Sequence, residues 1–496
     1  MVVRPAALEH KGFLNSLPVE FAMNVSTKLT TLLGSMLLGS LSLTAAELDP
    51  AQQWPNWRGP LANGSTSTAT PPTEFGEQKN LKWKVAIPGS GTATPIVWGD
   101  KIFVQTAIPT GKRANGTPVA ALTSGPSVMA QATPPPPGGP GQGKRRPGGP
   151  GGPGGGMRGE QPVEVFQFAV LCLDRNTGKT LWTKVVREQV PHEGHHQTHG
   201  YASGSPVTDG KMLYAYFGSR GLYAMDFSGN IKWEKDFGDQ QTRNGFGEGT
   251  SPALAGDRLI INWDHEGEDD FIVALDKTSG KELWRKPRAE ATTWSTPFIV
   301  EHADITQAIV NATGKTRSYD IKNGDLLWEC GGQTVNAIPS VVAIDGLAIA
   351  MSGFKGSVVN AIKLGSKGDV TGTDSIAWTY NKGTPYVPSP LLYGGKLYFF
   401  SGNEALLSIF DAKTGERHVE TERISGLTGV YASPLGAGGN VYLAGRDGGM
   451  VVIKQGSKVE IVSKTRLDEP IDAQPVAVGQ ELIIRGSKSL YSFAAK

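Results

Sequence analysis

The sequence predicts an all-β protein, an eight-bladed β-propeller of four-stranded blades whose last blade is closed by an N-terminal strand. A proline that in most cases follows Ser or Thr opens a short apolar run eight times along the chain, at Pro95, Pro206, Pro252, Pro297, Pro339, Pro390, Pro434 and Pro475. From the second proline onward the spacings are 46, 45, 42, 51, 44 and 41 residues, which is the length of one blade. The final repeat stops one strand short, and a matching strand stands near the N-terminus.

Residues 1–46 have the pattern of an export signal. Residues 1–22 are an uncertain leader; from Met23 the chain has a charged start at Lys28, an apolar run over residues 29–43 and then Thr44-Ala45-Ala46. We assign residues 23–46 to a signal peptide and residues 47–80 to an N-terminal extension. No cysteine stands directly after the apolar run, where a bacterial lipid anchor would be attached, so a lipid anchor is not expected. We therefore expect a soluble periplasmic or secreted protein without stable membrane insertion; an uncleaved signal anchor is the alternative.

Each repeat has the same internal order, and the third shows it most clearly. Residues 251–262 read as strand, tight turn and strand, residues 271–275 as a third strand, residues 276–280 as a turn and residues 281–284 as a fourth strand. The Asp-Gly-Trp ending of this repeat recurs at Asp174/Gly178/Trp182, Asp226/Gly229/Trp233 and Asp320/Gly324/Trp328. We expect the tryptophans to pack between blades.

The two ends of the propeller are expected to meet in one sheet. The eighth repeat ends with the apolar run at residues 489–493, and its missing strand is supplied by residues 81–85, which end in the same apolar-Lys-Trp form as residues 231–233. Such closure removes the exposed sheet edges of an open stack. The propeller therefore spans residues 81–493.

The first repeat contains a Pro/Gly-rich insertion over residues 108–162. Its composition cannot supply a packed core, so we expect a disordered loop. The second strand is expected to end near Gln105, and Val163 to resume the sheet. A tether to an anionic surface, through Lys144-Arg145-Arg146, is the alternative.

Charge and cysteine content exclude several functional classes. The net charge of +2 argues against a nucleic-acid-binding surface. The chain has two cysteines, Cys172 in the third strand of the first blade and Cys330 just after the fourth strand of the fourth blade. Their blades are not adjacent, so we expect two buried thiols and no disulfide. We expect a monomer.

One face of the disc gathers the residues suited to a ligand. The loops between blades and the loops between second and third strands share this face, because strands alternate in direction. Residues at equivalent register in different blades should meet around one mouth of the channel. The ligand-binding candidates are Arg220, Glu248, His265, Trp294, Asn336, Tyr386, Tyr431 and Arg446. A polar channel that holds only water is the alternative.

Two patches on the same face have the composition of metal sites. Residues 191–200 contain four imidazoles, which can bind Zn²⁺ or Cu²⁺, at His192, His195, His196 and His199. Residues 264–270 are acidic and could hold Ca²⁺ through oxygen ligands, although they lack an EF-hand spacing. The alternatives are a hydrogen-bonded polar loop and a solvated acidic loop.

The alternating Ser/Thr-Pro strand and the Asp-x-x-x-Gly-x-x-Leu-Trp ending resemble the pyrrolo-quinoline-quinone (PQQ)-like β-propeller repeat. The resemblance covers residues 81–493, and the leader at residues 54–60 resembles the opening of a bacterial subgroup of these proteins. The repeat is shared by dehydrogenases, outer-membrane assembly factors and kinase-linked sensor domains, so the resemblance alone leaves the function open. Quinone dehydrogenases hold PQQ over a floor Trp with a Ca²⁺ bound by Glu, Asn and Asp, often beneath an adjacent Cys pair, whereas outer-membrane protein assembly factors of this superfamily are non-catalytic.

This chain departs from the enzyme pattern. Its cysteines are separate, and no haem-attachment, Gly-x-Ser-x-Gly or P-loop motif occurs. We assign no catalytic residue, do not expect PQQ, and retain a divalent metal as the cofactor to test. The expected function is an exported non-catalytic binding or scaffold protein that presents its channel-mouth face to a protein, glycan or small molecule. The alternative is a quinone- or metal-dependent oxidoreductase of the quinoprotein dehydrogenase type.

Overall fold

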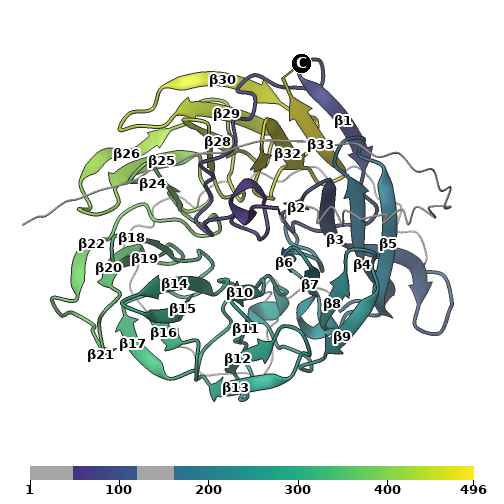
Figure 1. Ribbon diagram of the computed structural model, residues 1–496, viewed down its shortest axis with the longest axis horizontal. Coiled ribbons are helices and arrows are strands. Elements are labelled where there is room, and N and C mark those ends of the chain that lie inside the picture. The colour runs from purple at the N-terminus through teal and green to yellow at the C-terminus, as the bar shows by residue number, and fades with distance from the viewer. Residues whose placement is uncertain (1–47, 120–160, 496) are drawn as a thin grey trace, which may run out of the picture. The chain divides into compact units, whose positions relative to one another are not determined.

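The computed structural model describes residues 48–119 and 161–495. Residues 48–496 form one compact unit in which eight sheets are arranged as a ring around a central channel (Figure 1). The predicted eight-bladed propeller is confirmed. The leader, the signal peptide at residues 23–46 and residues 120–160 of the insertion lie outside the described residues.

The first four blades follow one another along the chain, each with its first strand beside the channel. Blades 1 and 2 consist of β2 (Ile96–Trp98), β3 (Lys101–Arg113), β4 (Glu164–Asp174) and β5 (Thr180–Gln189), then β6 (Val207–Thr208), β7 (Met212–Tyr216), β8 (Leu222–Asp226) and β9 (Ile231–Lys235). Blades 3 and 4 consist of β10 (Ala253–Ala255), β11 (Arg258–Trp263), β12 (Phe271–Asp276) and β13 (Glu282–Pro287), then β14 (Phe298–His302), β15 (Ile305–Asn311), β16 (Lys315–Asp320) and β17 (Leu326–Gly331).

The remaining blades repeat this order. Blades 5 and 6 consist of β18 (Val342–Ile344), β19 (Leu347–Ser352), β20 (Val358–Lys363) and β22 (Ile376–Tyr380), then β23 (Leu391–Tyr393), β24 (Lys396–Phe400), β25 (Leu406–Asp411) and β26 (Arg417–Arg423). Blade 7 consists of β27 (Leu435–Ala437), β28 (Asn440–Ala444), β29 (Gly449–Lys454) and β30 (Ile461–Arg466). The short β21 (Gly368–Asp369) adds to the outer edge of blade 4, parallel to β17.

Blade 8 is closed by a strand from the other end of the chain. It contains β31 (Val476–Val478), β32 (Glu481–Arg485), β33 (Ser489–Ala494) and, outermost, β1 (Leu81–Ala86). β1 runs antiparallel to β33, with Val85 opposite Leu490 and Leu81 opposite Phe493. The predicted closure is therefore confirmed.

The tryptophan at the end of the repeat joins blade 8 to blade 1 and each of blades 1 to 3 to the next blade, whereas the Trp328 indole donates to Gln307 of its own blade. The Trp233 indole of blade 2 donates a hydrogen bond to the Lys277 carbonyl oxygen of blade 3 at 3.0 Å. The same ring covers Gly280, where a Cβ atom would lie 2.6 Å from Trp233 Cε3. Equivalent indole-to-carbonyl bonds join Trp83 to Arg175, Trp182 to Phe227 and Trp284 to Ile321. The expected packing of these tryptophans between blades is confirmed, and it explains why the turn requires glycine.

Two strand boundaries differ from the sequence prediction. β3 continues to Arg113 rather than ending near Gln105, and its partner β4 begins at Glu164. The paired segment of the insertion adopts a long hairpin because Pro109 falls at a register irregularity, where a missing amide donor is tolerated. Cys330 lies within β17 rather than after it.

Both cysteines are free, and each is fully buried in a different hydrophobic cluster. Burial raises the pKa of Cys172 to about 12 and that of Cys330 to about 11. The expectation of two unlinked buried thiols is confirmed.

A chain of hydrogen bonds runs around the channel at the start of the inner strands. Except in blade 7, the residue that begins the inner segment of a blade donates its backbone N–H to the side-chain hydroxyl at the equivalent position of the next blade; in all of these blades but blade 5 this residue precedes a proline. Within the described residues seven such links are formed: Thr94 to Ser205, Ser205 to Ser251, Ser251 to Thr296, Thr296 to Ser340, Ser340 to Ser389, Ser389 to Ser433 and Gln474 to Thr94. We call this set the hydroxyl ring.

Blade 5 is out of register with the proline repeat. Ser340, which follows Pro339, occupies the hydroxyl-ring position, and β18 begins two residues later at Val342. Val341 therefore stands where the other inner strands have proline. Pro339 belongs to the loop before the strand, so its place in the sequence repeat was misleading.

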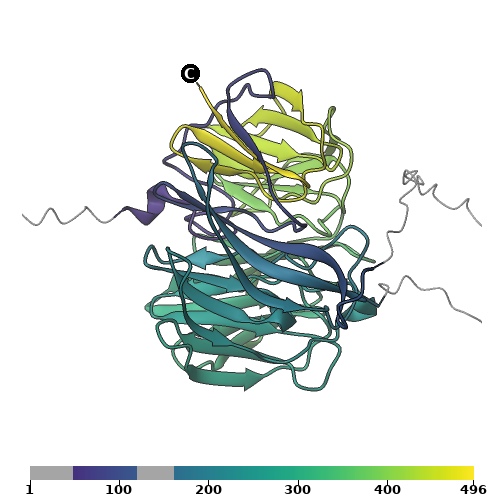
Figure 2. The same ribbon diagram turned by 90° about the vertical axis from the view of Figure 1, so that its right-hand side faces the viewer.

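The N-terminal extension crosses the channel on the face opposite the β3–β4 hairpin tip. It begins with a short 3-10 helix, η1 (Pro50–Gln52), which Figure 2 shows at the other side of the disc from that hairpin. Trp54 then pairs with Val97 of blade 1, and Ser65 pairs with Gly436 of blade 7. The extension therefore spans the opening between two inner strands before it reaches β1.

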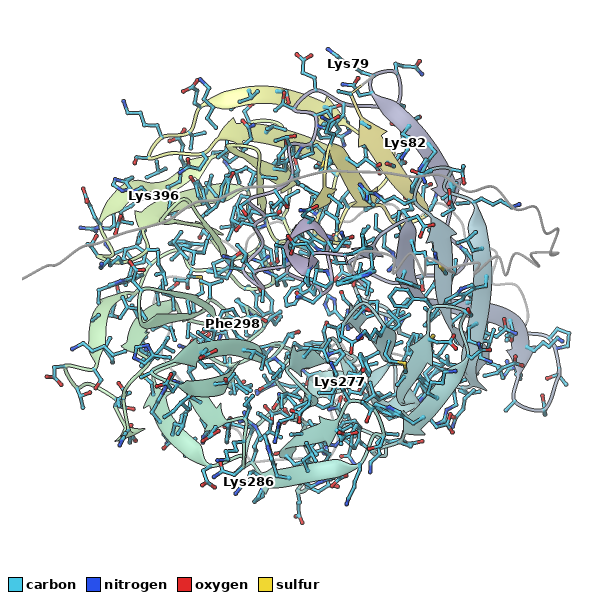
Figure 3. The ribbon with its side chains drawn as sticks, in the orientation of Figure 1. Lys79, Lys82, Lys277, Lys286, Phe298 and Lys396 are labelled. Carbon is cyan, nitrogen blue, oxygen red and sulfur yellow. The ribbon has the colours of Figure 1, made fainter. Side chains whose placement is uncertain are left out.

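The inner and outer parts of each blade differ in chemistry. Figure 3 shows Phe298 of β14 near the centre of the ring, whereas Lys286 of β13 projects at the rim.

No helix among the described residues is long and apolar enough to cross a membrane.

Candidate functional site

The channel contains a chamber of about 360 Å³ on the face predicted to hold the site. The hydroxyl ring contributes Thr94, Ser205, Ser251 and Ser433 to its wall. Its larger side chains are aromatic: Trp57, Phe246, Trp294, Phe354, Tyr386 and Tyr431. An apolar wall with converging hydroxyl groups is typical of small-molecule sites.

Five of the predicted residues belong to this chamber or pack directly against it. Trp294, Tyr386 and Tyr431 line it. Asn336, in the left-handed backbone region at φ 56°, hydrogen-bonds with the Tyr386 side chain. The Arg446 guanidinium lies over the Tyr431 ring, 4.0 Å from its centroid. The loops that lead into blades 4 to 7 and the β28–β29 loop of blade 7 therefore converge on one space.

The aromatic rings are held in defined orientations. Tyr386 stacks on Phe354, with centroids 4.7 Å apart and planes inclined by 22°. Trp294 donates its indole N–H to the Gly247 carbonyl oxygen at 2.7 Å. Since these contacts fix the rings before any ligand arrives, the chamber is preorganised.

Charge in the chamber is confined to one neutralised pair. Asp472 is the only acidic residue in the wall, and no Lys or Arg lines it among the described residues. Asp472 accepts two hydrogen bonds from Arg446, at 2.9 and 3.3 Å. Burial raises the pKa of Asp472, and the guanidinium opposes that shift. The chamber thus presents almost no net charge to a ligand.

Residues 190–201, which we call the roof loop, extend from blade 1 across one end of the chamber. Thr198 donates a hydrogen bond at 3.3 Å to the Tyr431 hydroxyl of blade 7, on the other side of the channel. His196 lies edge-on to Phe246, with centroids 5.0 Å apart. Burial and the nearby Arg446 charge lower the pKa of His196, so the roof also favours a neutral state.

Trp57 of the N-terminal extension forms the floor. It lines the chamber and also a second cavity of about 320 Å³ on the opposite face, so it separates the two spaces. The adjacent Arg58 is buried and donates to Gln474 Oε1 at 2.6 Å and to the Pro390 carbonyl oxygen. Gln474 is the one residue of the hydroxyl ring whose side chain has no hydroxyl group. Its side-chain oxygen instead accepts the hydrogen bond from Arg58, next to the floor residue Trp57. The sequence pattern at residues 54–60 marked this segment but did not reveal that role.

Two predicted residues line a smaller pocket beside the chamber. Arg220, in the 3-10 helix η2 (Gly218–Arg220), and Glu248 border a pocket of about 40 Å³ formed by the loops before and after blade 2. Arg220 is paired with Asp239. These side chains turn away from the chamber because Glu248 accepts hydrogen bonds from the Ser219 backbone and hydroxyl. They therefore do not share the mouth formed by Trp294, Tyr386 and Tyr431.

His265 lines neither space. Its ring is buried, and its Nδ1 accepts a hydrogen bond from the Gly267 backbone at 3.0 Å. In the same acidic segment, Asp264 is bonded twice to Arg288, at 2.6 and 3.0 Å. Asp270 accepts the His265 N–H at 2.9 Å. The carboxylates of Asp264 and Asp270 in the predicted Ca²⁺ loop thus already bind protein donors.

The four imidazoles of the roof loop serve different partners. His195 Nδ1 bonds with the His196 carbonyl oxygen, and His199 lies between the Glu248 carbonyl oxygen and Ser203. Among the described residues one group brings three potential metal ligands within 4.8 Å of one another, and His192 is the one imidazole in it. His195, His196 and His199 are not part of this group.

The run from His192 to His196 also has the H-E-x-x-H spacing, which our sequence interpretation overlooked. That spacing places two imidazoles on one face only when the segment is helical. The roof loop is not helical, and His192 and His196 lie at different pockets. The helical zinc-protease geometry is therefore not formed.

Comparison with known proteins identifies the repeat. Residues 167–381 match the family model described as outer membrane protein assembly factor BamB. Two solved structures span nearly the whole chain. The quinohemoprotein alcohol dehydrogenase of Comamonas testosteroni is 11% identical, covers 91% of this chain and 82% of that chain, and gives a TM-score of 0.57. A europium-containing methanol dehydrogenase is 10% identical, covers 90% of this chain and 99% of that chain, and also gives 0.57. The chain therefore has the β-propeller fold of these structures, and residues 167–381 are similar to the assembly-factor family that carries the PQQ-type repeat.

Other PQQ-repeat propellers are similar over a smaller part. BamB from Moraxella catarrhalis is 12% identical, covers 66% of this chain and 93% of that chain, and gives a TM-score of 0.49. No curated protein sequence matches the chain. At these identities the likeness of the PQQ-repeat propellers to this chain shows the fold alone.

Proposed function

We propose that this propeller is an exported, non-catalytic binding protein whose chamber holds an uncharged, hydroxyl-bearing ring compound, with a neutral sugar as the best-fitting class. The observation that carries the proposal is the wall itself, in which aromatic faces alternate with the hydroxyl ring and the charges cancel. Sugar rings present apolar C–H faces to aromatic side chains and hydroxyl groups to polar ones. Such a ligand would use both features of the wall.

The charge distribution argues against PQQ as the ligand. PQQ carries several carboxylate groups, and a buried anion requires cationic partners. Arg446, which lies over the Tyr431 ring of the wall, is already engaged by Asp472. Placing PQQ beside Asp472 would add repulsion, and among the described residues no Lys or Arg lines the chamber to offset it. The residues of the chamber therefore do not fit this cofactor, and we derive no redox step.

The proposal is tested by titrating the purified protein with a panel of probes while recording tryptophan fluorescence. The panel contains neutral mono- and disaccharides, the anionic sugar gluconate, and PQQ with Ca²⁺. We expect saturable quenching by at least one neutral sugar and weaker or absent quenching by gluconate and PQQ. Tight binding of PQQ with dye-linked alcohol oxidation would support the oxidoreductase and overturn the proposal.

Variants locate the binding. Trp294→Ala should weaken sugar binding at least about tenfold, because it removes a stacking face worth roughly 1.4 kcal/mol. The matched control is Trp284→Phe, since Trp284 lies between blades at the rim and donates to Ile321. Equal affinities for Trp294→Ala and the wild type would contradict the assignment of the chamber.

A further inference from the structure

We propose a second site, a divalent transition-metal centre formed by His192, Glu193 and Glu248 beside the chamber. One ligand atom from each side chain lies within 4.8 Å of the other two. One imidazole with two carboxylates is a donor set suited to Zn²⁺ or Mn²⁺. His192 and Glu193 lie in the loop between blades 1 and 2, and Glu248 lies in the loop between blades 2 and 3, so a bound ion would link these two loops.

The three side chains border a common cavity. All of them line the pocket of about 40 Å³, which exceeds the roughly 10–15 Å³ needed to hold a water molecule and therefore has room for an ion. Gly218 is required beside it, because a Cβ atom at this position would overlap the Glu248 carboxylate and its φ of 55° favours glycine. The backbone is thus shaped around the carboxylate.

Charge balance at this pocket requires a cation. Arg220 is paired with Asp239, so it does not neutralise the two glutamates. Glu193 is bonded to the backbone and hydroxyl of Thr242, and Glu248 to those of Ser219, which are neutral donors. The hydrogen bonds of the two glutamates thus come from neutral groups, and a divalent ion would offset their negative charge.

The present positions of the ligands are consistent with metal entry. His192 Nε2 lies 3.8 Å from Glu248 Oε1 and 2.5 Å from the Gln240 carbonyl oxygen, to which it donates. When His192 Nε2 loses the proton that it donates to the Gln240 carbonyl oxygen, the nitrogen becomes able to bind a metal ion.

The experiment uses the full exported chain, stripped with a chelator and dialysed, and titrated with ZnCl₂ in a calorimeter. We expect one saturable site. Glu248→Gln and His192→Gln should each weaken Zn²⁺ binding at least about tenfold. Co²⁺ titration should give visible absorption bands of low symmetry that the same variants lose.

Two matched variants serve as controls. His195→Gln changes an imidazole of the same loop outside the group, and Glu266→Gln changes a carboxylate that is bonded to Thr292 much as Glu193 is bonded to Thr242. Both should bind Zn²⁺ as the wild type does. Absence of saturable binding to the wild type would overturn the proposal, as would equal losses in His195→Gln and His192→Gln. If circular dichroism shows that Glu248→Gln is unfolded, His192→Gln decides the result.

Discussion

The Gln474 backbone N–H donates a hydrogen bond to Thr94 Oγ1 at 3.3 Å, and this contact joins the last blade to the first. The two residues are 380 positions apart, and both line the chamber. The same contact type recurs around the channel, so the hydroxyl ring both fixes the inner strands and presents polar atoms to a ligand.

The hydroxyl ring should contribute measurably to stability. Ser251→Ala removes the acceptor of the Ser205 N–H, which lies 2.9 Å from Ser251 Oγ in a buried position. An unsatisfied buried donor costs about 1–3 kcal/mol, so the urea midpoint should fall accordingly. Ser251→Thr keeps the hydroxyl and should retain most of the stability. An unchanged midpoint for Ser251→Ala would show that water or another acceptor replaces the hydroxyl.

The contact between glycine and tryptophan should dominate the cost of altering the blade junction. Gly280 and Gly256 both have positive φ, 71° and 62°, but only Gly280 is covered, by Trp233. Gly256→Ala should cost about 1–2 kcal/mol from backbone strain. Gly280→Ala should cost about 1–3 kcal/mol more, because its Cβ enters the indole. Equal losses in thermal unfolding would refute the junction as a packing constraint.

The two thiols should be inert in the native protein. The raised pKa values of Cys172 and Cys330, about 12 and about 11, leave almost no thiolate at pH 8. Mass spectrometry after brief iodoacetamide treatment should detect no label on native protein and two labels after denaturation. Rapid native labelling would mean that at least one blade opens locally.

The Asp276 turn should make a pH-dependent contribution. Hydrogen bonds from Thr278 and Ser279 hold the Asp276 pKa at about 2, below its usual 3.8. The folded state therefore favours the carboxylate, and its stabilisation is present above about pH 4 and lost as the pH falls towards 2. Asp276→Ala should lower stability by about 1 kcal/mol at pH 7, since the site is solvent-screened. The difference from wild type in urea unfolding should shrink at pH 2.5; a constant difference would contradict this.

The sequence was sufficient for the fold because a blade repeats its constraints. The Asp-Gly-Trp ending predicted the junction contact of Trp233, and the unfinished eighth repeat predicted the pairing of Val85 with Leu490. The proline pattern gave the wrong register for blade 5, because Pro339 lies in a loop and Ser340 takes the hydroxyl-ring position. Spacing alone does not distinguish these arrangements.

Register placed the candidate site only in part. It brought Trp294 and Tyr386 to one chamber, since equivalent loops reach equivalent depth. It did not give side-chain direction, so Glu248 turned to Ser219 and a separate pocket. The floor at Trp57 comes from outside the repeat and has no counterpart in it. Such tertiary contacts leave no periodic signal in the sequence.

The most direct test of the proposed function is a crystal structure of the protein soaked with the neutral sugar that binds most tightly in the fluorescence titration. We predict difference density for the sugar ring between Trp294 and Tyr431, with hydroxyl groups near the hydroxyl ring. Density at the outer rim with an unchanged chamber, or PQQ in the chamber of crystals soaked with PQQ and Ca²⁺, would contradict the account.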